Sequence, residues 1–487
     1  MDHKVAVILF PGSNCELEAL RACRRSKLTA DLIRWNDDYS KLKKYDAFIL
    51  PGGFSYEDRG RSGIIAAQDP IMDVIKQQAE AGKPVLGLCN GCQILVEKGM
   101  IPGLNPNHLE LAMGWNERVK KGKILGVGFY NDWIYIRHDA TKGRSVFNRF
   151  SQKEVMRIPV AHGEGRFTTL EKNLLENLKN NEQTLFRYCD ENGKIVEEFP
   201  VNPNGAMYNL AGVCNPEGNV LALMPHPERT TVGQPIFDSL ADYLNSSKKT
   251  LVKPKSLTAD KKKSQSSQKT SARSPIQDKP EKMTKKPDIT MLIRLIITDN
   301  EERTMENTVK RLGFNATLKR QIFLGFDLKD KKDLKKTAEK LLASGEILNL
   351  NKEIPTIYIG DEVYSYSKDK GLQPMQNQLP NNFHFIVTEY DNYTGKSIRA
   401  NLQNHLHDNV IEKVERGVFW SMEAKDQATS DQIIKTHLFH NPHSMKLILA
   451  DFGGKSAKNE SSKSDFQSQN PDFQIQRSNS NQKNISN

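Results

Sequence analysis

The stretch Lys83-Pro84-Val85-Leu86-Gly87-Leu88-Cys89-Asn90-Gly91-Cys92-Gln93 decides the fold expected of this 487-residue chain. Its apolar first half predicts a buried strand that turns sharply at Cys89 into a helix. Gly87 and Gly91, two positions either side of Cys89, allow the strand and the helix to approach each other closely. A thiol at the start of a helix lies where free backbone amides favour a thiolate and can hold an oxyanion. The stretch therefore predicts a nucleophilic cysteine suited to acyl transfer.

A second run, Met224-Pro225-His226-Pro227-Glu228, supplies a base for that nucleophile. His226 follows an apolar strand over residues 220–224 and sits between two prolines that restrict its backbone. Glu228 can accept a hydrogen bond from the imidazole and set its tautomer. Taken singly, a buried thiol or a loop histidine is ordinary. Their joint occurrence with the glycine spacing favours a Cys89–His226–Glu228 triad.

The remaining cysteines predict no metal site. Cys92 shares a C-x-x-C with Cys89 but lacks a second ligand pair, so we expect it to pack inside the helix. The four others show no paired metal spacing and are expected to be plain core or surface residues: Cys15, Cys23, Cys189 and Cys214.

Apolar strands alternate with helical patterns along the first half of the chain. Strands are expected at residues 5–10, 47–51, 85–88 and 220–224, with helices at 71–81 and 94–97. This alternation predicts a doubly wound, flavodoxin-like α/β domain with a parallel sheet. Sites in such folds lie at the carboxyl ends of the strands, where Cys89, Gly53 and His226 all fall.

With these motifs in place, residues 1–247 resemble the glutaminase subunits of phosphoribosylformylglycinamidine synthases, which are triad class I glutamine amidotransferases. Besides the two runs above, the resemblance rests on the segments FPGSNC at 10–15, LPGGFSY at 50–56, PVAHGEG at 159–165, NPNG at 202–205 and AGVCN at 211–215. The order of the segments matches the family, which makes the resemblance more specific than the nucleophile motif alone.

The resemblance implies that Cys89 attacks the side-chain amide of glutamine, forms a glutamyl thioester and releases ammonia. His226 would protonate the leaving amine. The backbone amides of Gly53 and Asn90 are the expected oxyanion donors, and Gln93 is expected to contact glutamine, although it can equally cap the helix. The loop over residues 57–63 departs from the family pattern, so its contacts stay open.

Composition limits the other function classes. The length predicts about three domains, and no segment approaches the ~20 apolar residues of a membrane span. The start of the sequence has no signal-peptide pattern, so a cytoplasmic protein is expected. Residues 248–288 are rich in Lys, Ser and Pro and predict a disordered basic linker. Because much of the net charge of +11 lies in this linker, with lysines at 261–263, we expect no nucleic-acid partner.

The C-terminal half predicts two small α/β repeats, over residues 289–356 and 380–452. Each shows the order β-α-β-β-α, with Gly325 and Gly417 expected at equivalent turns. Each resembles the small bridging subunit of the same synthase family, which implies that the two copies pair with each other. Residues 453–487 predict a disordered tail.

Two groups of side chains in the unmatched regions are expected to have no catalytic role. The aromatic residues between 107 and 137 are expected in the core, with partner contact as the alternative. The histidines lack a coherent metal spacing and are expected on the exposed surface: His405, His407, His437, His440 and His443.

The sequence as a whole predicts a glutaminase that passes ammonia to a separate, large ATP-dependent synthetase subunit in purine biosynthesis. No cofactor is expected on this chain, because it shows no phosphate-binding loop; ATP and Mg would be used by the partner. Two alternatives stay open. One is a glutaminase subunit for another acceptor, and the other is a catalytically silent scaffold.

Overall fold

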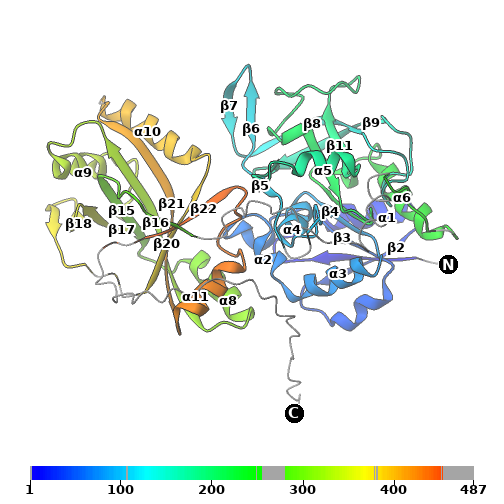
Figure 1. The fold of residues 1–487 in the computed structure, drawn as a ribbon, viewed down its shortest axis with the longest axis horizontal. Coiled ribbons are helices and arrows are strands. Elements are labelled where there is room, and N and C mark those ends of the chain that lie inside the picture. Colours follow the sequence, from blue (N-terminus) through cyan, green and yellow to red (C-terminus); the bar gives the residue numbers. More distant parts are fainter. Residues whose placement is uncertain are drawn as a thin grey trace, which may run out of the picture.

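The computed structural model describes residues 3–105, 108–247, 249–254, 280–377, 379, 382–407, 409–450 and 452, which form two α/β units lying side by side (Figure 1). Residues 255–279 of the predicted linker, including lysines 261–263, and the predicted tail at 453–487 lie outside the described residues. The described chain resumes at residue 280, inside the range predicted as linker, and residues Glu281–Lys282 form strand β14.

The N-terminal unit contains one large mixed sheet. Its parallel part runs in the order β2 (Thr29–Arg34), β1 (Lys4–Leu9), β3 (Ala47–Leu50), β4 (Val85–Leu88) and β13 (Val220–Leu223). An antiparallel part continues it with β12 (Leu210–Cys214), β11 (Thr184–Cys189), β8 (Tyr130–His138) and β9 (Val155–His162). The doubly wound α/β class is confirmed. The antiparallel extension was not predicted.

Helices cover both faces of this sheet, which is why its central strands are apolar without alternation. Every residue of β3 and β4 is buried. The helices of this unit are α1 (Glu16–Arg25), α2 (Ile64–Ala67), α3 (Pro70–Glu80), α4 (Asn90–Glu97), α5 (Leu174–Asn180) and α6 (Gln234–Asn245).

Two short two-stranded sheets extend from the antiparallel part. One pairs β5 (Ala112–Gly114) with β10 (Arg166–Thr168), and the other is the projecting hairpin β6 (Glu117–Lys120) and β7 (Lys123–Val127) (Figure 1). The expectation that the aromatic residues here belong to the core is wrong for three of them. Trp115 and Phe129, which flank the hairpin, are 39% and 56% exposed, and Trp133, on β8 of the large sheet, is 46% exposed.

The C-terminal unit is a second sheet in the order β14-β22-β20-β21-β16-β15-β17-β18-β19. Its two longest strands, β16 (Ala316–Leu328) and β21 (Ile411–Ala424), pair antiparallel at the centre. The other elements are β15 (Ile289–Leu295), β17 (Glu353–Ile359), β18 (Glu362–Ser367), β19 (Gly371–Pro374), β20 (Phe383–Glu389), β22 (Met445–Leu449), α8 (Asn300–Arg311), α9 (Leu334–Ala343), α10 (Tyr393–Leu406) and α11 (Gln427–Lys435).

The predicted order within each repeat needs correction. Each copy runs β-α-β-α-β, as β15-α8-β16-α9-β17 and as β20-α10-β21-α11-β22. Gly325 and Gly417 do not lie at turns. They lie inside the long central strands, where Gly325 pairs with Glu415 and Gly417 pairs with Phe323. A cross-strand partner at each glycine keeps the hydrogen-bond ladder intact, so one long strand forms where two were expected.

Apolar contact joins the two units. Ile64 and Ile65, at the start of α2, are 0% and 1% exposed because they lie in one cluster with C-terminal residues such as Met305 and Trp420. None of the helices that the structure describes is both long and apolar enough to span a lipid bilayer.

Polar contacts reinforce the same junction. The Arg61 guanidinium forms a buried ion pair with Glu97 (2.6 Å) and donates to the carbonyl oxygens of His437 (2.7 Å) and Leu438 (3.0 Å). The Asn441 side chain donates to Glu97 Oε1 (3.2 Å). The two units are therefore held in one arrangement by residues at the end of α4.

The histidine prediction is wrong at this junction. His440 and His443 are 6% and 2% exposed, and the His443 ring lies 2.8 Å from the carbonyl oxygen of Leu109 in the N-terminal unit. His437 is half-buried, while His405 and His407 are exposed as predicted. Sequence alone could not reveal the burial, because it comes from the other half of the chain.

We predict that Ile65→Ala lowers the free energy of unfolding by about 3 kcal/mol, because it removes a buried side chain and leaves a cavity between the units. Leu17→Ala, at a position that is 49% exposed, is the control and should cost less than about 0.5 kcal/mol. Denaturant unfolding of the full chain measures both. Equal effects of the two substitutions would show that α2 is not held in the C-terminal core.

Candidate functional site

Cys89 occupies a strained turn between β4 and α4. Its backbone has φ 49° and ψ −104°, a conformation that residues with a side chain rarely adopt. The neighbouring glycines make the turn possible. A Cβ at Gly91 would lie 2.0 Å from the carbonyl oxygen of Leu50, and a Cβ at Gly87 would lie 2.4 Å from that of Gly91. The close packing of α4 on the sheet thus holds the thiol at the carboxyl end of β4.

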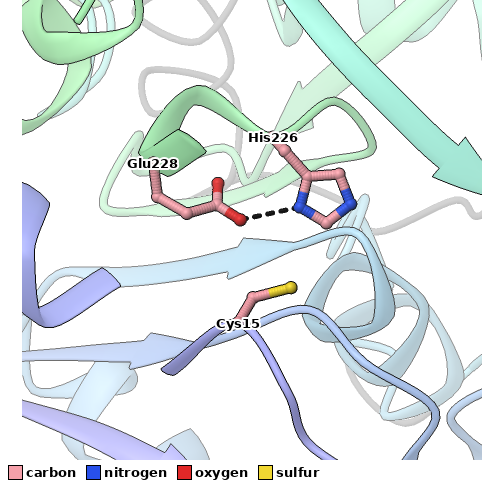
Figure 2. Close-up of side chains that lie close together, drawn as sticks. All are labelled: Cys15, His226 and Glu228. Atoms are coloured by element: carbon pink, nitrogen blue, oxygen red, sulfur yellow. Dashed lines mark hydrogen bonds and ion pairs between the residues drawn. The ribbon is translucent and has the colours of Figure 1, made fainter. Parts of the chain in front are cut away.

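His226 and Glu228 lie beside this turn, after the end of β13. The ring Nδ1 of His226 is 2.7 Å from Oε1 of Glu228, and both residues are buried (Figure 2). Because the Glu228 carboxylate accepts from Nδ1, the other ring nitrogen, Nε2, is free to act as the base. His226 Nε2 is buried and makes no hydrogen bond of normal geometry within the described part of the chain, as is common for a base without its substrate.

The pKa of His226 is raised well above its ordinary value. Burial by itself would lower it, but the electrostatic effects of Cys89 and of the Glu228 carboxylate outweigh burial, and the Cys15 side chain contributes as well. Stabilisation of the imidazolium by these neighbours suits a cysteine–histidine pair that transfers a proton within the site.

Cys15 is a site neighbour that sequence reasoning missed. Its sulfur points toward the imidazole (Figure 2) and lies, with one ligand atom each of His226 and Glu228, in a group whose atoms are all within 4.8 Å of one another. The Arg229 guanidinium donates to the Cys15 sulfur at 2.9 Å, and its positive charge disfavours a metal cation at this group. The position of Cys15 in the FPGSNC segment was the available signal.

The two expected oxyanion donors lie on either side of Cys89. Asn90 begins α4, and Gly53 has φ +146° and pairs with Ser13 in an isolated bridge. Neither backbone amide has a hydrogen-bond partner among the residues that the structure describes. Free amides at a helix N-terminus beside a thiol can stabilise developing negative charge.

Gln93 is committed to contacts inside the protein. Its side-chain oxygen accepts from Asn90 Nδ2 (2.9 Å) and its amide donates to the carbonyl oxygen of Glu164 (2.6 Å). These bonds join α4 to the segment after β9. Gln93 also lines the cavity described below. Its position is compatible with a contact to the substrate as well as with a role in positioning Asn90.

Besides Cys89, the site has strained backbone at the start of the 57–63 loop and at the residue before it. Tyr56, Glu57 and Asp58 have φ of 53°, 59° and 52°, three consecutive left-handed residues without a glycine among them. Burial raises the pKa of the Asp58 carboxyl to about 6 and that of Glu164 to about 7. Both carboxyl groups face the same cavity as Cys89.

A cavity of about 430 Å³ contains the Cys89 thiol and reaches into the C-terminal unit. This volume lies within the range of small-molecule sites. His162, which lines the cavity, places Nδ1 3.1 Å from Asn116 Oδ1 and leaves its buried Nε2 without a partner in the described chain. Burial lowers the pKa of His162 to about 3, so the ring is a neutral acceptor there.

Comparisons with known proteins identify the N-terminal half. The family model of the CobB/CobQ-like glutamine amidotransferase domain matches residues 2–240. Phosphoribosylformylglycinamidine synthase subunit PurQ of Methanothrix thermoacetophila is 41% identical over 258 residues, covering 50% of this chain and 98% of that protein. The PurQ subunit of Aquifex aeolicus is 42% identical over 231 residues, covering 47% of this chain and 91% of that protein. The chain belongs to the PurQ family.

Among solved structures, a chain of PurLQS from Thermotoga maritima is 33% identical, with a TM-score of 0.40 and coverage of 50% of this chain and 100% of that chain. The family match ends at residue 240, so the C-terminal sheet lies outside the part shared with PurQ proteins. The N-terminal half is a glutamine amidotransferase domain, and the glutaminase family predicted from the sequence is confirmed.

We predict that Gly52→Ala lowers kcat for glutamine hydrolysis by about 100-fold or more, because displacing a positioned catalytic group by about 1 Å has this effect. A Cβ at Gly52 would lie 2.7 Å from His226 Cε1 and 3.0 Å from the Cys15 sulfur. Gly82→Ala, where nothing lies within 4 Å, is the control and should lower stability without lowering kcat. Unchanged kcat in Gly52→Ala would contradict the close packing around His226.

Proposed function

We propose that this PurQ-family chain hydrolyses glutamine to glutamate and ammonia as the glutaminase component of a phosphoribosylformylglycinamidine synthase, in purine biosynthesis. The observation that carries the proposal is the buried His226–Glu228 pair next to a cysteine in a strained strand-to-helix turn. The choice of synthase follows from the PurQ relatives, which are named as subunits of phosphoribosylformylglycinamidine synthase.

In the first step the Cys89 sulfur, whose proton is held by His226, attacks the side-chain carbonyl carbon of glutamine. The amides of Gly53 and Asn90 hold the resulting oxyanion. Collapse of the tetrahedral intermediate breaks the carbon–nitrogen bond, and His226 gives its proton to the departing ammonia. Glu228 stabilises the imidazolium throughout.

The thioester is then hydrolysed by the same groups in reverse roles. His226 removes a proton from water, the hydroxide attacks the thioester carbonyl, and the proton returns to the Cys89 sulfur as glutamate leaves. Gln93 is proposed to orient the glutamine by holding Asn90 and the Glu164 segment in place, in addition to any direct contact.

The released ammonia is proposed to pass to a separate, ATP-dependent synthetase subunit. The described residues beyond 280 are proposed to be two copies similar to the small bridging subunit of such synthases, with boundaries near 289–356 and 380–452. The pairing of β16 with β21 supports this, because it joins two copies of the same β-α-β-α-β order into one sheet. All six cysteines are free thiols, which fits a reducing compartment such as the cytoplasm.

We predict that Cys89→Ala abolishes glutamate release from glutamine, whereas Cys189→Ala, which removes a thiol on β11 away from the cavity, leaves it unchanged. Glutamate release by the wild-type chain is expected to be low alone and to rise when the synthetase and its ligands are added, since free ammonia would otherwise be lost.

The two variants are compared with and without the synthetase in the same coupled assay. Residual release by Cys89→Ala equal to that of the wild type would contradict the proposed nucleophile. High release by the wild type without the partner would contradict the coupling but not the glutaminase.

A further inference from the structure

The C-terminal unit forms one wall of the cavity that holds the nucleophile. Strands β20 and β21 contribute Thr388, Glu389 and Arg416 to this wall, opposite Cys89 and Asp58 of the N-terminal unit. The glutamine site of this chain is therefore not confined to the part that it shares with PurQ proteins, which ends at residue 240.

Arg416 is a cation without an anion bound to it. Its guanidinium forms no ion pair and no side-chain hydrogen bond with any residue that the structure describes, although the residue is half-buried in the cavity wall. Burial and the neighbouring Arg320 lower its pKa. Arg320 itself is paired, with Asp299 at 3.0 Å and Glu301 at 2.7 Å. A desolvated guanidinium is costly unless an anion binds it.

Glu389 does not satisfy Arg416. The Glu389 carboxylate accepts a hydrogen bond from the indole nitrogen of Trp115 at 2.7 Å, and it acts on Arg416 only through the longer-range electrostatic attraction. The geometry that a guanidinium prefers, two parallel hydrogen bonds to one carboxylate, is thus unfilled.

Thr388 supplies a second, independent sign of a missing ligand. Its residue is 2% exposed, its hydroxyl oxygen is buried without a hydrogen-bond partner among the described residues, and it lines the same cavity. Buried hydroxyl groups in folded proteins are nearly always hydrogen-bonded. The Thr388 hydroxyl and the Arg416 guanidinium, on one wall of the cavity, can both donate hydrogen bonds to a carboxylate.

The opposite wall carries the complementary charge. Asp58 receives a hydrogen bond from Asn90 Nδ2 at 3.4 Å, and Glu164 receives one from the backbone amide of Ser62 at 3.4 Å. Neither carboxyl group forms an ion pair with a cation of the described chain. The two arginines of the neighbouring loop are bound elsewhere, Arg61 to Glu97 and Arg59 to Glu57. Two carboxyl groups in a partly buried position suit an ammonium group.

We infer that the two halves of the chain hold the amino-acid end of glutamine between them, with Arg416 and Thr388 on its α-carboxylate and Asp58 and Glu164 on its α-ammonium. The inference rests on the proposed glutaminase function. It makes the C-terminal unit part of the substrate site, so glutamine binding depends on how the two units are docked.

The test uses the full chain and the rate at which Cys89 is alkylated by the diazoketone analogue of glutamine, measured by intact mass. A second probe carries an α-carboxamide in place of the α-carboxylate. Arg416→Gln is expected to slow labelling by the carboxylate probe about 10- to 100-fold, the size of a lost charge-assisted hydrogen bond, and to leave labelling by the carboxamide probe unchanged. Arg416→Lys should recover part of the rate because it restores the charge without the planar fork.

Thr388→Val is a second variant that keeps the side-chain shape and should slow the carboxylate probe about fivefold. Lys413→Gln, on the same strand β21 with its side chain 55% exposed, is the matched control and should behave as the wild type. Equal loss of both probes in Arg416→Gln, or no loss of either, would overturn the inference. Failure of the wild type to react with either probe would instead overturn the proposed glutaminase.

Discussion

The strained turn at Cys89 is the constraint on which the rest of the site depends. Helix α4 packs so closely on the sheet that positions 87 and 91 accept only glycine, and the thiol is thereby fixed at the carboxyl end of β4. Strand β13 runs parallel to β4, with Leu223 opposite Leu88. Parallel register brings the residues just beyond both strands to one edge, so His226 reaches Cys89 without any further element.

The same helix connects the nucleophile to the second half of the chain. Cys89 precedes the first residue of α4, and Glu97 is its last. Glu97 is bound by Arg61 from the 57–63 loop and by Asn441 from the C-terminal unit. One short helix therefore holds the Cys89 thiol, the 57–63 loop and the C-terminal sheet in a single arrangement. Losing one partner of this buried ion pair would cost about 3–5 kcal/mol.

The sequence predicted those features of the fold and the site that short stretches of residues determine. The buried strands, the glycine spacing and the two short motifs indicated the parallel sheet and the residues that lie together at Cys89. What could not be predicted depends on contacts between distant segments. Cys15 looked like an ordinary core thiol, His440 and His443 looked exposed, and Trp115 looked buried. Cys15 is placed by residues more than 200 positions away in its own unit, and His443 is buried against Leu109 of the other unit.

The 57–63 loop contacts both halves of the chain. Here the loop carries Arg61, which binds two carbonyl oxygens of the C-terminal unit, and it precedes Ile64 and Ile65, which enter the C-terminal core. The loop thus combines part of the cavity wall with a surface that contacts the C-terminal unit, and positive φ angles occur where it begins, at Tyr56, Glu57 and Asp58.

The central claim, that glutamine binds between the two halves at Cys89, is tested most directly by a crystal structure of the full chain after alkylation by the diazoketone analogue of glutamine. The account predicts a covalent bond to the Cys89 sulfur and the α-carboxylate of the adduct in contact with Arg416 and Thr388. An adduct held entirely by the N-terminal unit, with the C-terminal wall turned away from it, would contradict the account.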